Sequence, residues 1–163
     1  MRMYRVPYTG TITAAGGDVD LLSLQPADDK PVRLAGWILG QTTEEGDAAA
    51  EHVRLTVRHM VATVTIGSGG AAPTPVANRP GTADVAAAGF TARCNDTTVS
   101  TTTGANTIME ELGWNLQQTP WERWIPEDQR PIAMQGEALI VRLEDAPADD
   151  FTGVFTFFVE ELP

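Results

Sequence analysis

Several short stretches of the sequence alternate apolar and polar residues with a period of two, and turn-forming residues separate these stretches. From Tyr4 to Ile12, every second side chain falls on one face. Successive side chains of a strand point to opposite faces, so this period is typical of a strand that is buried on one face. Pro7 lacks a backbone N–H, which restricts this strand to a sheet edge or a bulge.

The same pattern predicts further strands at residues 19–24, 32–39, 53–66, 85–94, 106–117, 139–143 and 154–159. In residues 139–143, three apolar side chains are expected to face inward and Arg142 outward. Little helix is expected, and the turn signals have the spacing of an antiparallel sandwich. We therefore predict an all-β, antiparallel two-sheet β-sandwich of about eight strands, with a jelly-roll-like topology. Periodicity alone does not give the strand order.

The length of 163 residues is enough to bury a core without disulfides or metals, and we predict a single domain over residues 1–163. Residues 67–83 contain four glycines and three prolines and almost no large apolar side chain. Such a segment cannot bury enough surface to fold by itself. We expect a long loop that is either mobile or ordered by something outside the chain.

The chain carries 22 acidic and 11 basic side chains, for a formal charge of −11. This charge repels phosphate backbones and anionic membranes, so neither nucleic acid nor membrane is expected as a partner. The single cysteine, Cys94, excludes an intrachain disulfide. With no signal-like start and no apolar run of about 20 residues, we expect a soluble chain, and the lone cysteine suits assembly in a reducing cytoplasm.

Residues that could carry catalysis are few and scattered. His52 and His59 are seven positions apart, which places them on opposite faces of a strand and prevents them from sharing a metal. Residues 67–70 lack the Lys-Ser/Thr ending of a phosphate-binding loop, and Gly-x-Ser-x-Gly does not occur. Cys94, beside Arg93, is expected to be an inert thiol. We predict no catalytic residues, no cofactor and no enzyme activity.

Clustered carboxylates are the remaining source of chemistry, and they fall in predicted loops: Asp18, Asp20, Asp28, Asp29, Glu44, Glu45, Asp47, Asp149 and Asp150. Oxygen-rich loops can bind calcium, and two carboxylates that approach in space can hydrolyse glycosides. Both remain alternatives. None of the clusters has the spacing of a calcium loop, so we expect solvated surface acids and no metal.

Two of the four tryptophans, Trp121 and Trp124, lie in the proline-flanked segment 120–131. Residues three apart on a strand point to opposite faces, so the two rings form one platform only if they lie on a helical turn. A platform of this kind could stack on sugars. A second interpretation is a proline-braced crossing loop that pins one ring on each side. A third buries one ring and uses the other as an anchor in a subunit interface, where Trp and Arg are enriched.

Two parts of the sequence resemble a known family. The first is residues 39–58, and the second comprises the segments 113–115, 124–126, 130–132 and 136–143. Together they resemble small virion proteins of tailed bacteriophages, which are β-sandwich capsid decoration or minor capsid proteins. The resemblance implies a jelly-roll-like protomer, commonly trimeric, bound to the outside of the head. It implies no catalytic residues.

We therefore predict a non-enzymatic virion structural protein, a decoration subunit on the outer capsid surface that bridges capsid subunits. Its expected partners are the major capsid protein and further copies of itself in a homotrimer. The expected interface anchors are Trp121, Arg123, Trp124 and Arg130, with Tyr4 and the loop from Val76 to Pro80 as secondary anchors. A tail, fibre or host-glycan binding module is one alternative, and a neck or tail structural component is another.

Overall fold

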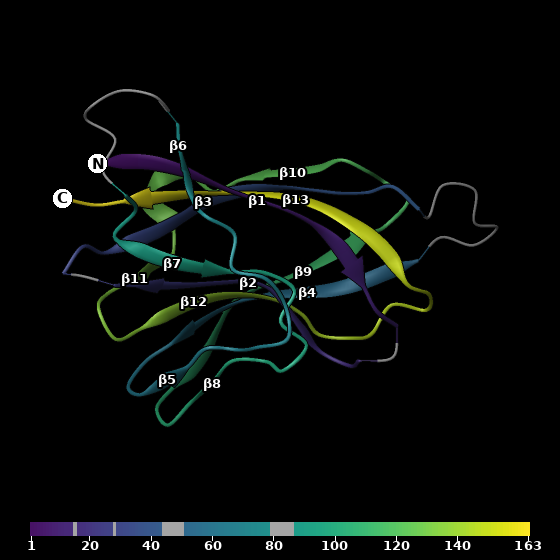
Figure 1. The fold of residues 1–163 in the computed structure, drawn as a ribbon, viewed down its shortest axis with the longest axis horizontal. Helices are drawn as coiled ribbons and strands as arrows, with labels where there is room; N and C mark the ends of the chain where they lie inside the picture. The colour runs from purple at the N-terminus through teal and green to yellow at the C-terminus, as the bar shows by residue number, and fades with distance from the viewer. Residues whose placement is uncertain (15, 28, 44–50, 79–86) are drawn as a thin grey trace.

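The computed structural model describes residues 1–163 except 15, 28, 44–50 and 79–86, and it consists almost entirely of antiparallel strands (Figure 1). Sheet A has the order β10 (Trp121–Trp124), β3 (Val32–Gln41), β13 (Phe151–Glu161), β1 (Arg2–Ile12) and β6 (Val76–Ala77), and β11 (Ile132–Ala133) also pairs with β3. Sheet B has the order β7 (Phe90–Arg93), β2 (Val19–Pro26), β12 (Ala138–Leu143), β4 (His52–Met60) and β9 (Asn106–Asn115). β5 (Val64–Thr65) pairs with β8 (Thr101–Thr102), and η1 (Glu127–Gln129) is one 3₁₀ turn.

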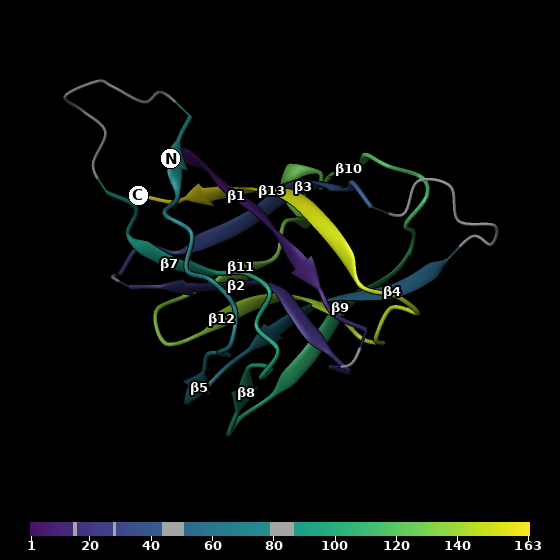
Figure 2. The same cartoon turned by 45° about the vertical axis from the view of Figure 1, so that its right-hand side comes forward.

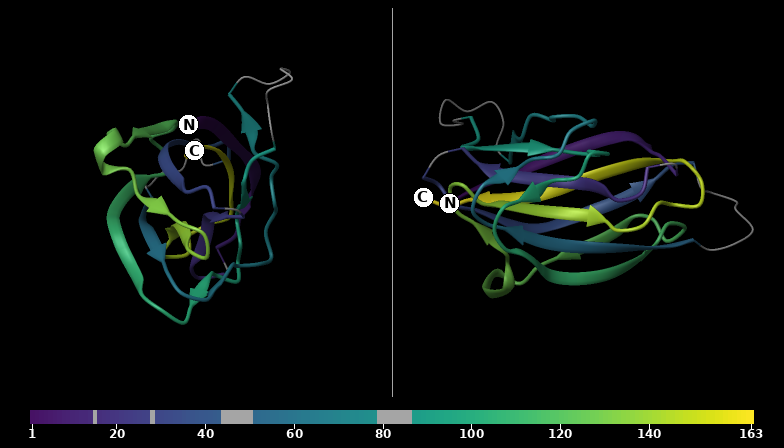
Figure 3. Two further views of the ribbon diagram at one scale, coloured as in Figure 1. Left: turned by 90° about the vertical axis from the view of Figure 1, so that its left-hand side faces the viewer. Right: turned by 90° about the horizontal axis from the view of Figure 1, so that it is seen from below.

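Strand pairing follows the jelly-roll pattern. β1 pairs with β13, β2 with β12, β3 with β10 and β4 with β9, so early strands pair with late strands in reverse order. This arrangement is an antiparallel ribbon of four strand pairs that is wound into two facing sheets. The predicted all-β two-sheet sandwich is confirmed. There are 13 strands rather than about eight, because five short strands, β5, β6, β7, β8 and β11, are added to the eight of the ribbon. The two chain ends lie close together at one end of the sandwich (Figure 3).

The observed boundaries differ from the predicted ones at several strands. The predicted strand 53–66 is wrong beyond Met60, because Ala62 adopts a positive φ of 69° and the chain turns to start β5. The predicted strand 85–94 begins only at Phe90 among the described residues. Pro7 agrees with its prediction: β6 pairs with β1 only at Tyr4 and Arg5, so Pro7 lies where β1 forms the edge of sheet A.

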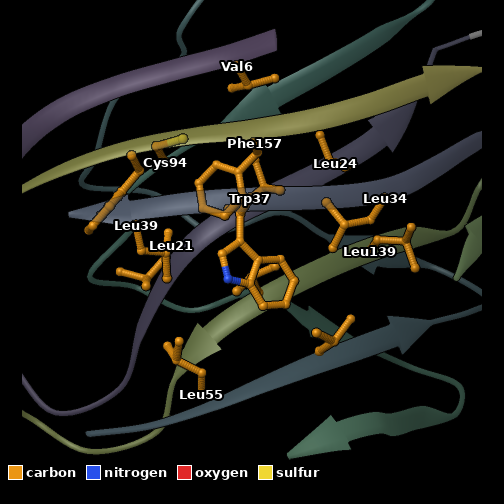
Figure 4. Close-up of a cluster of buried hydrophobic side chains, with 14 of the residues drawn as sticks. Val6, Leu21, Leu24, Leu34, Trp37, Leu39, Leu55, Cys94, Leu139 and Phe157 are labelled. Atoms are coloured by element: carbon orange, nitrogen blue, oxygen red, sulfur yellow. The ribbon is translucent and has the colours of Figure 1, made fainter. Parts of the chain in front are cut away.

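The core lies between the two sheets. Trp37 of β3 is fully buried at its centre, with side chains from both sheets around it, including Phe157 from sheet A and Leu55 and Leu139 from sheet B (Figure 4). The alternation that was visible in the sequence produces this layer, because each strand directs every second side chain inward. Residues 139–143 of β12 behave as predicted, with Leu139, Val141 and Leu143 in the core.

The outer face of sheet B is covered by a flap, which we define as residues 64–71 and 94–103. β5 and β8 lie side by side within it (Figures 1 and 2), and isolated bridges at Ser68–Thr98 and Ala71–Cys94 continue their pairing. Residues 67–71 were predicted to belong to a loop that needs contacts outside the chain. That part of the prediction is wrong, because their backbone hydrogen-bonds to residues 94–100 of the same chain.

Charged side chains lie buried beneath the flap. Arg142 points away from the core, as predicted, but the flap covers it and leaves it only 6% exposed. It donates to Asp20 at 2.6 Å and to the carbonyl of Ser100 at 2.8 Å. Asp20 was grouped with the solvated loop carboxylates, but it is a fully buried residue of β2, within the strand predicted at residues 19–24. Its second oxygen accepts the backbone N–H of Ser100 at 2.6 Å, which ties the flap to sheet B.

Candidate interaction surface

Much of the outer face of sheet A is open to solvent, in contrast to the covered face of sheet B. A continuous row of residues crosses it in register. Trp124 of β10 pairs with Gly36 of β3, Gly36 with Phe158 of β13, Phe158 with Arg5 of β1, and Arg5 with Val76 of β6. We call these five residues the outer row.

Trp124 and Phe158 form an aromatic pair on this face although they belong to strands that are not neighbours. Their ring centroids are 4.4 Å apart at an interplanar angle of 33°. Gly36 lies between them and has no side chain to separate them. A Cβ at Gly36 would lie 2.2 Å from the carbonyl oxygen of Arg123, and its φ of 155° also favours glycine. The close approach of β10 to β3 therefore places Trp124 against Phe158.

Apolar groups concentrate on the same face. Eight large apolar side chains are exposed in the described part of the chain. Four of them belong to the outer face of sheet A by strand register: Val76, Trp124, Ile132 and Val154. Trp124 is 54% exposed. A contiguous exposed apolar patch is typical of an interaction site, and the Trp124–Phe158 pair is the contiguous part of this set.

The charges of the face fall into a paired set and an unpaired set. Glu160 is buried between Arg33, at 3.0 Å, and Arg130. Arg5 instead lies with its guanidinium carbon 6.0 Å from the centre of the Phe158 ring. Glu122 is exposed in the neighbouring row. Over the described ranges, neither Arg5 nor Glu122 has an ion-pair partner.

The tryptophan pair is divided between core and surface. Residues 121–124 form a strand in register with β3, so the interpretation as a crossing loop is wrong. Trp121 points inward and packs against Trp37, with centroids 5.8 Å apart, and against Trp114, at 6.4 Å. Trp124 points outward, as the alternation of a strand requires. Arg123 points inward and forms an ion pair with Glu110.

The other predicted anchors lie in different environments. Tyr4 is in the core, 1% exposed, with its ring edge-on to Phe90 at 5.5 Å, because it shares the inward face of β1 with Val6. It is therefore not available at a surface. Arg130 binds Glu160 and the carbonyl of Ile125, which makes it a brace within the chain. Val76 is exposed in the outer row, and Pro80 lies outside the described residues.

Arg5 and Phe158 were not predicted from the sequence as residues of an interaction surface. A signal for Phe158 was present, since adjacent residues of a strand face opposite ways and Phe157 belongs to the core. Arg5 had no comparable signal, because its position depends on pairing between β1 and β13, at opposite ends of the chain.

The remaining reactive groups are engaged or buried. Burial raises the pKa of the Cys94 thiol to about 12, which agrees with the predicted inert thiol. His59 lies 2.9 Å from Glu137. Burial opposes ionisation of Glu137, but hydrogen bonds from the Met134 N–H and from His59 outweigh it and lower the pKa.

Within the described residues, no group of three or more His, Cys, Asp or Glu side chains could hold a metal ion. The same residues include no helix that is long and apolar enough to cross a membrane.

Comparison with known proteins identifies no family. No family model and no curated protein matches the sequence. Among solved structures, the chain is similar to one in the 2.6 Å structure of T=1 particles derived from infectious bursal virus, with 13% sequence identity and a TM-score of 0.24. The match covers 99% of this chain but only 40% of the viral chain. A TM-score this low does not establish a shared fold, so the likeness says nothing about the role of this chain.

Proposed function

We propose that this chain is a non-enzymatic structural subunit of a phage virion, which decorates and stabilises the outer surface of the head. The observation that carries the proposal is the open outer face of sheet A, where a row of apolar and aromatic groups lies on a rigid sandwich. Trp and Arg at the centre of such a face are the residue types that anchor protein interfaces.

The distribution of charge supports the same role. A chain of charge −11 is repelled by packaged DNA and suits the outside of a particle. Most described cations are engaged in ion pairs within the chain, such as Arg142 with Asp20 and Arg130 with Glu160. These ion pairs connect strands within the chain, and Arg142 also binds the flap, so they support the rigidity of the sandwich. The cations that they engage are not available to a partner, so contacts with a partner would be made mainly through the open face of sheet A.

The proposed mechanism is mechanical. Each subunit bridges adjacent copies of the major capsid protein and buries apolar surface at the contact, which raises the free energy needed to separate them. A standard protein interface buries about 1,600 Å² in total, and repetition over a lattice multiplies a modest contact. Copies of this chain are the second partner in the proposal.

Deletion of the gene from the phage that encodes it tests this function. Heads without the chain are expected to release DNA at lower temperature or lower salt than wild-type heads, and purified chain added back is expected to restore them. Heads of unchanged heat tolerance would contradict the proposal. Addition of the Trp124→Ala variant serves as the matched comparison, because that change removes an exposed ring and leaves the core intact.

A host-glycan binding module is the second candidate, and the exposure of Trp124 favours it. An indole ring that is supported on one side by Phe158 could stack on a sugar, with Arg5 and Glu122 as polar neighbours. Titration of the purified chain with host polysaccharide, followed by tryptophan fluorescence, separates the two functions. Saturable quenching that is lost in Trp124→Ala would favour the glycan module.

A further inference from the structure

Two unpaired opposite charges lie toward opposite sides of the outer face of sheet A. Glu122 is exposed on β10, and Arg5 is exposed on β1. β3 and β13 lie between these two strands. Neighbouring strands are about 4.8 Å apart, so three such spacings separate the two residues by about 14 Å, too far for them to pair within one chain.

An unpaired arginine is unexpected in a chain with twice as many acidic as basic side chains. Apart from Arg2 and Arg5, every lysine and arginine side chain in the described residues lies within ion-pair distance of a carboxylate. Arg5 is the one of these two that lies in the outer row beside the Trp124–Phe158 pair. No carboxylate of the described residues pairs with Arg5, so this arginine is available to a carboxylate of a partner chain.

We propose that the outer face of sheet A packs against the same face of a second copy of this chain, around a two-fold axis between β3 and β13. This proposal names a partner at the surface on which the proposed function rests. The axis places β10 of one copy over β1 of the other. Glu122 then faces the partner's Arg5, while Arg5 faces the partner's Glu122. A two-fold interface is self-complementary in this way, since each contact occurs twice.

The strand register allows this pairing. Glu122 lies in the row of Ile38, Thr156 and Pro7, and Pro7 is two residues along β1 from Arg5. The offset is therefore about 7 Å along the strand. Packed sheets usually cross at about 30°, and this crossing, together with two long side chains, accommodates the offset.

The same contact covers the apolar groups of the face and avoids charge repulsion. Trp124, Phe158 and Val154 all point into it. The charged side chains assigned to the face balance, with Arg5, Arg33 and Arg130 against Glu122, Glu127 and Glu160. The contact therefore joins surfaces that are far less acidic than the whole chain, whose formal charge is −11. The pairing is two-fold, whereas the resemblance noted from the sequence implies a trimer.

Sedimentation equilibrium of the full purified chain at moderate ionic strength tests the proposal. The expected species has about twice the 17.5 kDa of one chain. Arg5→Glu and Glu122→Arg are each expected to weaken the dimer by about tenfold or more, since each places like charges in contact. The double variant Arg5→Glu/Glu122→Arg restores opposite charges and is expected to dimerise within about threefold of wild type.

Matched controls lie on sheet B. Arg54 and Glu111 form an exposed ion pair there, so Arg54→Glu and Glu111→Arg repeat the same charge changes away from the face. They are expected to leave the dimer dissociation constant unchanged. Trp124→Ala is expected to weaken the dimer. In a Trp124→Ala background, the double variant Arg5→Glu/Glu122→Arg is still expected to recover the affinity that each single charge change removes. Thermal melting of each variant establishes that the fold is retained.

A monomer at all accessible concentrations, a trimer, or a double variant that fails to recover dimerisation would overturn the proposal. These outcomes are distinct from failure of the proposed function. A monomer that still stabilises heads removes the two-fold pairing alone. A dimer that has no effect on heads removes the virion role and leaves the pairing intact.

Discussion

The guanidinium of Arg123 on β10 donates to the carboxylate of Glu110 on β9 at 2.5 Å, and this ion pair joins the edge strands of the two sheets. The guanidinium carbon of Arg123 also lies 5.7 Å from the centre of the Trp37 ring. The pair therefore closes one side of the sandwich over the aromatic core. Both side chains remain partly exposed, so solvent screens the attraction between them.

Glu110→Gln is expected to lower the free energy of unfolding by about 0.5–1 kcal/mol, the usual range for a partly exposed ion pair. Arg123→Ala is expected to cost about 1–2 kcal/mol, because it also removes the contact with the Trp37 ring and the packing of the aliphatic stem. Urea denaturation measures both values. Glu111→Gln, at a more exposed ion pair of the same strand, is the control. Equal effects of Glu111→Gln and Glu110→Gln would contradict a closing role.

The buried pair of Asp20 and Arg142 makes a larger contribution to stability. Arg142→Ala leaves the carboxylate of Asp20 buried without its cation, which is expected to cost about 3–5 kcal/mol. Replacement of both residues, as Asp20→Leu/Arg142→Met, removes the buried charges together and is expected to cost less than Arg142→Ala alone. Guanidinium denaturation of the three proteins checks this order. A double variant less stable than the single variant would contradict it.

Trp121 and Trp124 are expected to respond differently to truncation. Trp121→Ala opens a cavity beside Trp37 and Trp114 and is expected to cost about 3 kcal/mol or more. Trp124→Ala removes a ring that is half exposed and is expected to cost about 1 kcal/mol. Thermal and urea unfolding measure the difference. Similar costs would mean that Trp124 belongs to the core rather than to an interaction surface.

Glu144 is expected to make stability depend on pH in the acid range. Its carboxylate accepts hydrogen bonds from Thr56 and Arg58. Burial opposes its ionisation, but these hydrogen bonds outweigh burial and lower the pKa below the ordinary value of 4.5. A carboxyl with a lowered folded-state pKa contributes stability above its unfolded pKa and loses that contribution as the pH falls through the folded pKa.

The free energy of unfolding is therefore expected to fall as the pH drops below about 5, and Glu144→Gln is expected to flatten part of that fall. Urea denaturation at a series of pH values from neutral to acid measures the slope. If the wild-type and Glu144→Gln slopes were identical, the stabilising role of Glu144 would be excluded.

The sandwich could be predicted from the sequence because alternation is a local property of each strand. Which strands pair is not local: β1 and β13 lie at opposite ends of the chain, and no periodicity connects them. The burial of Arg142 shows a second limit. Its position on β12 indicates a side chain that points away from the core, which is correct. Its burial depends on the flap, whose Gly-rich residues 67–70 carry the signals of a loop.

On the candidate surface, too, single residues could be predicted from local sequence signals, whereas their arrangement across strands could not. Trp124 was named from the sequence because tryptophan is rare and proline residues flank its segment. Tyr4 was named as well, although its alternation with Val6 already placed it on the apolar face of β1. The outer row as a whole could not be found, because it exists only through the register of β10, β3, β13, β1 and β6.

The most direct test of the proposed structural role is quantitative mass spectrometry of purified virions from the phage that we propose encodes the chain. We expect this protein to be present in fixed stoichiometric proportion to the major capsid protein and to be accessible to protease on intact heads. Its absence from purified particles, or its presence only at a trace level that varies between preparations, would contradict the account.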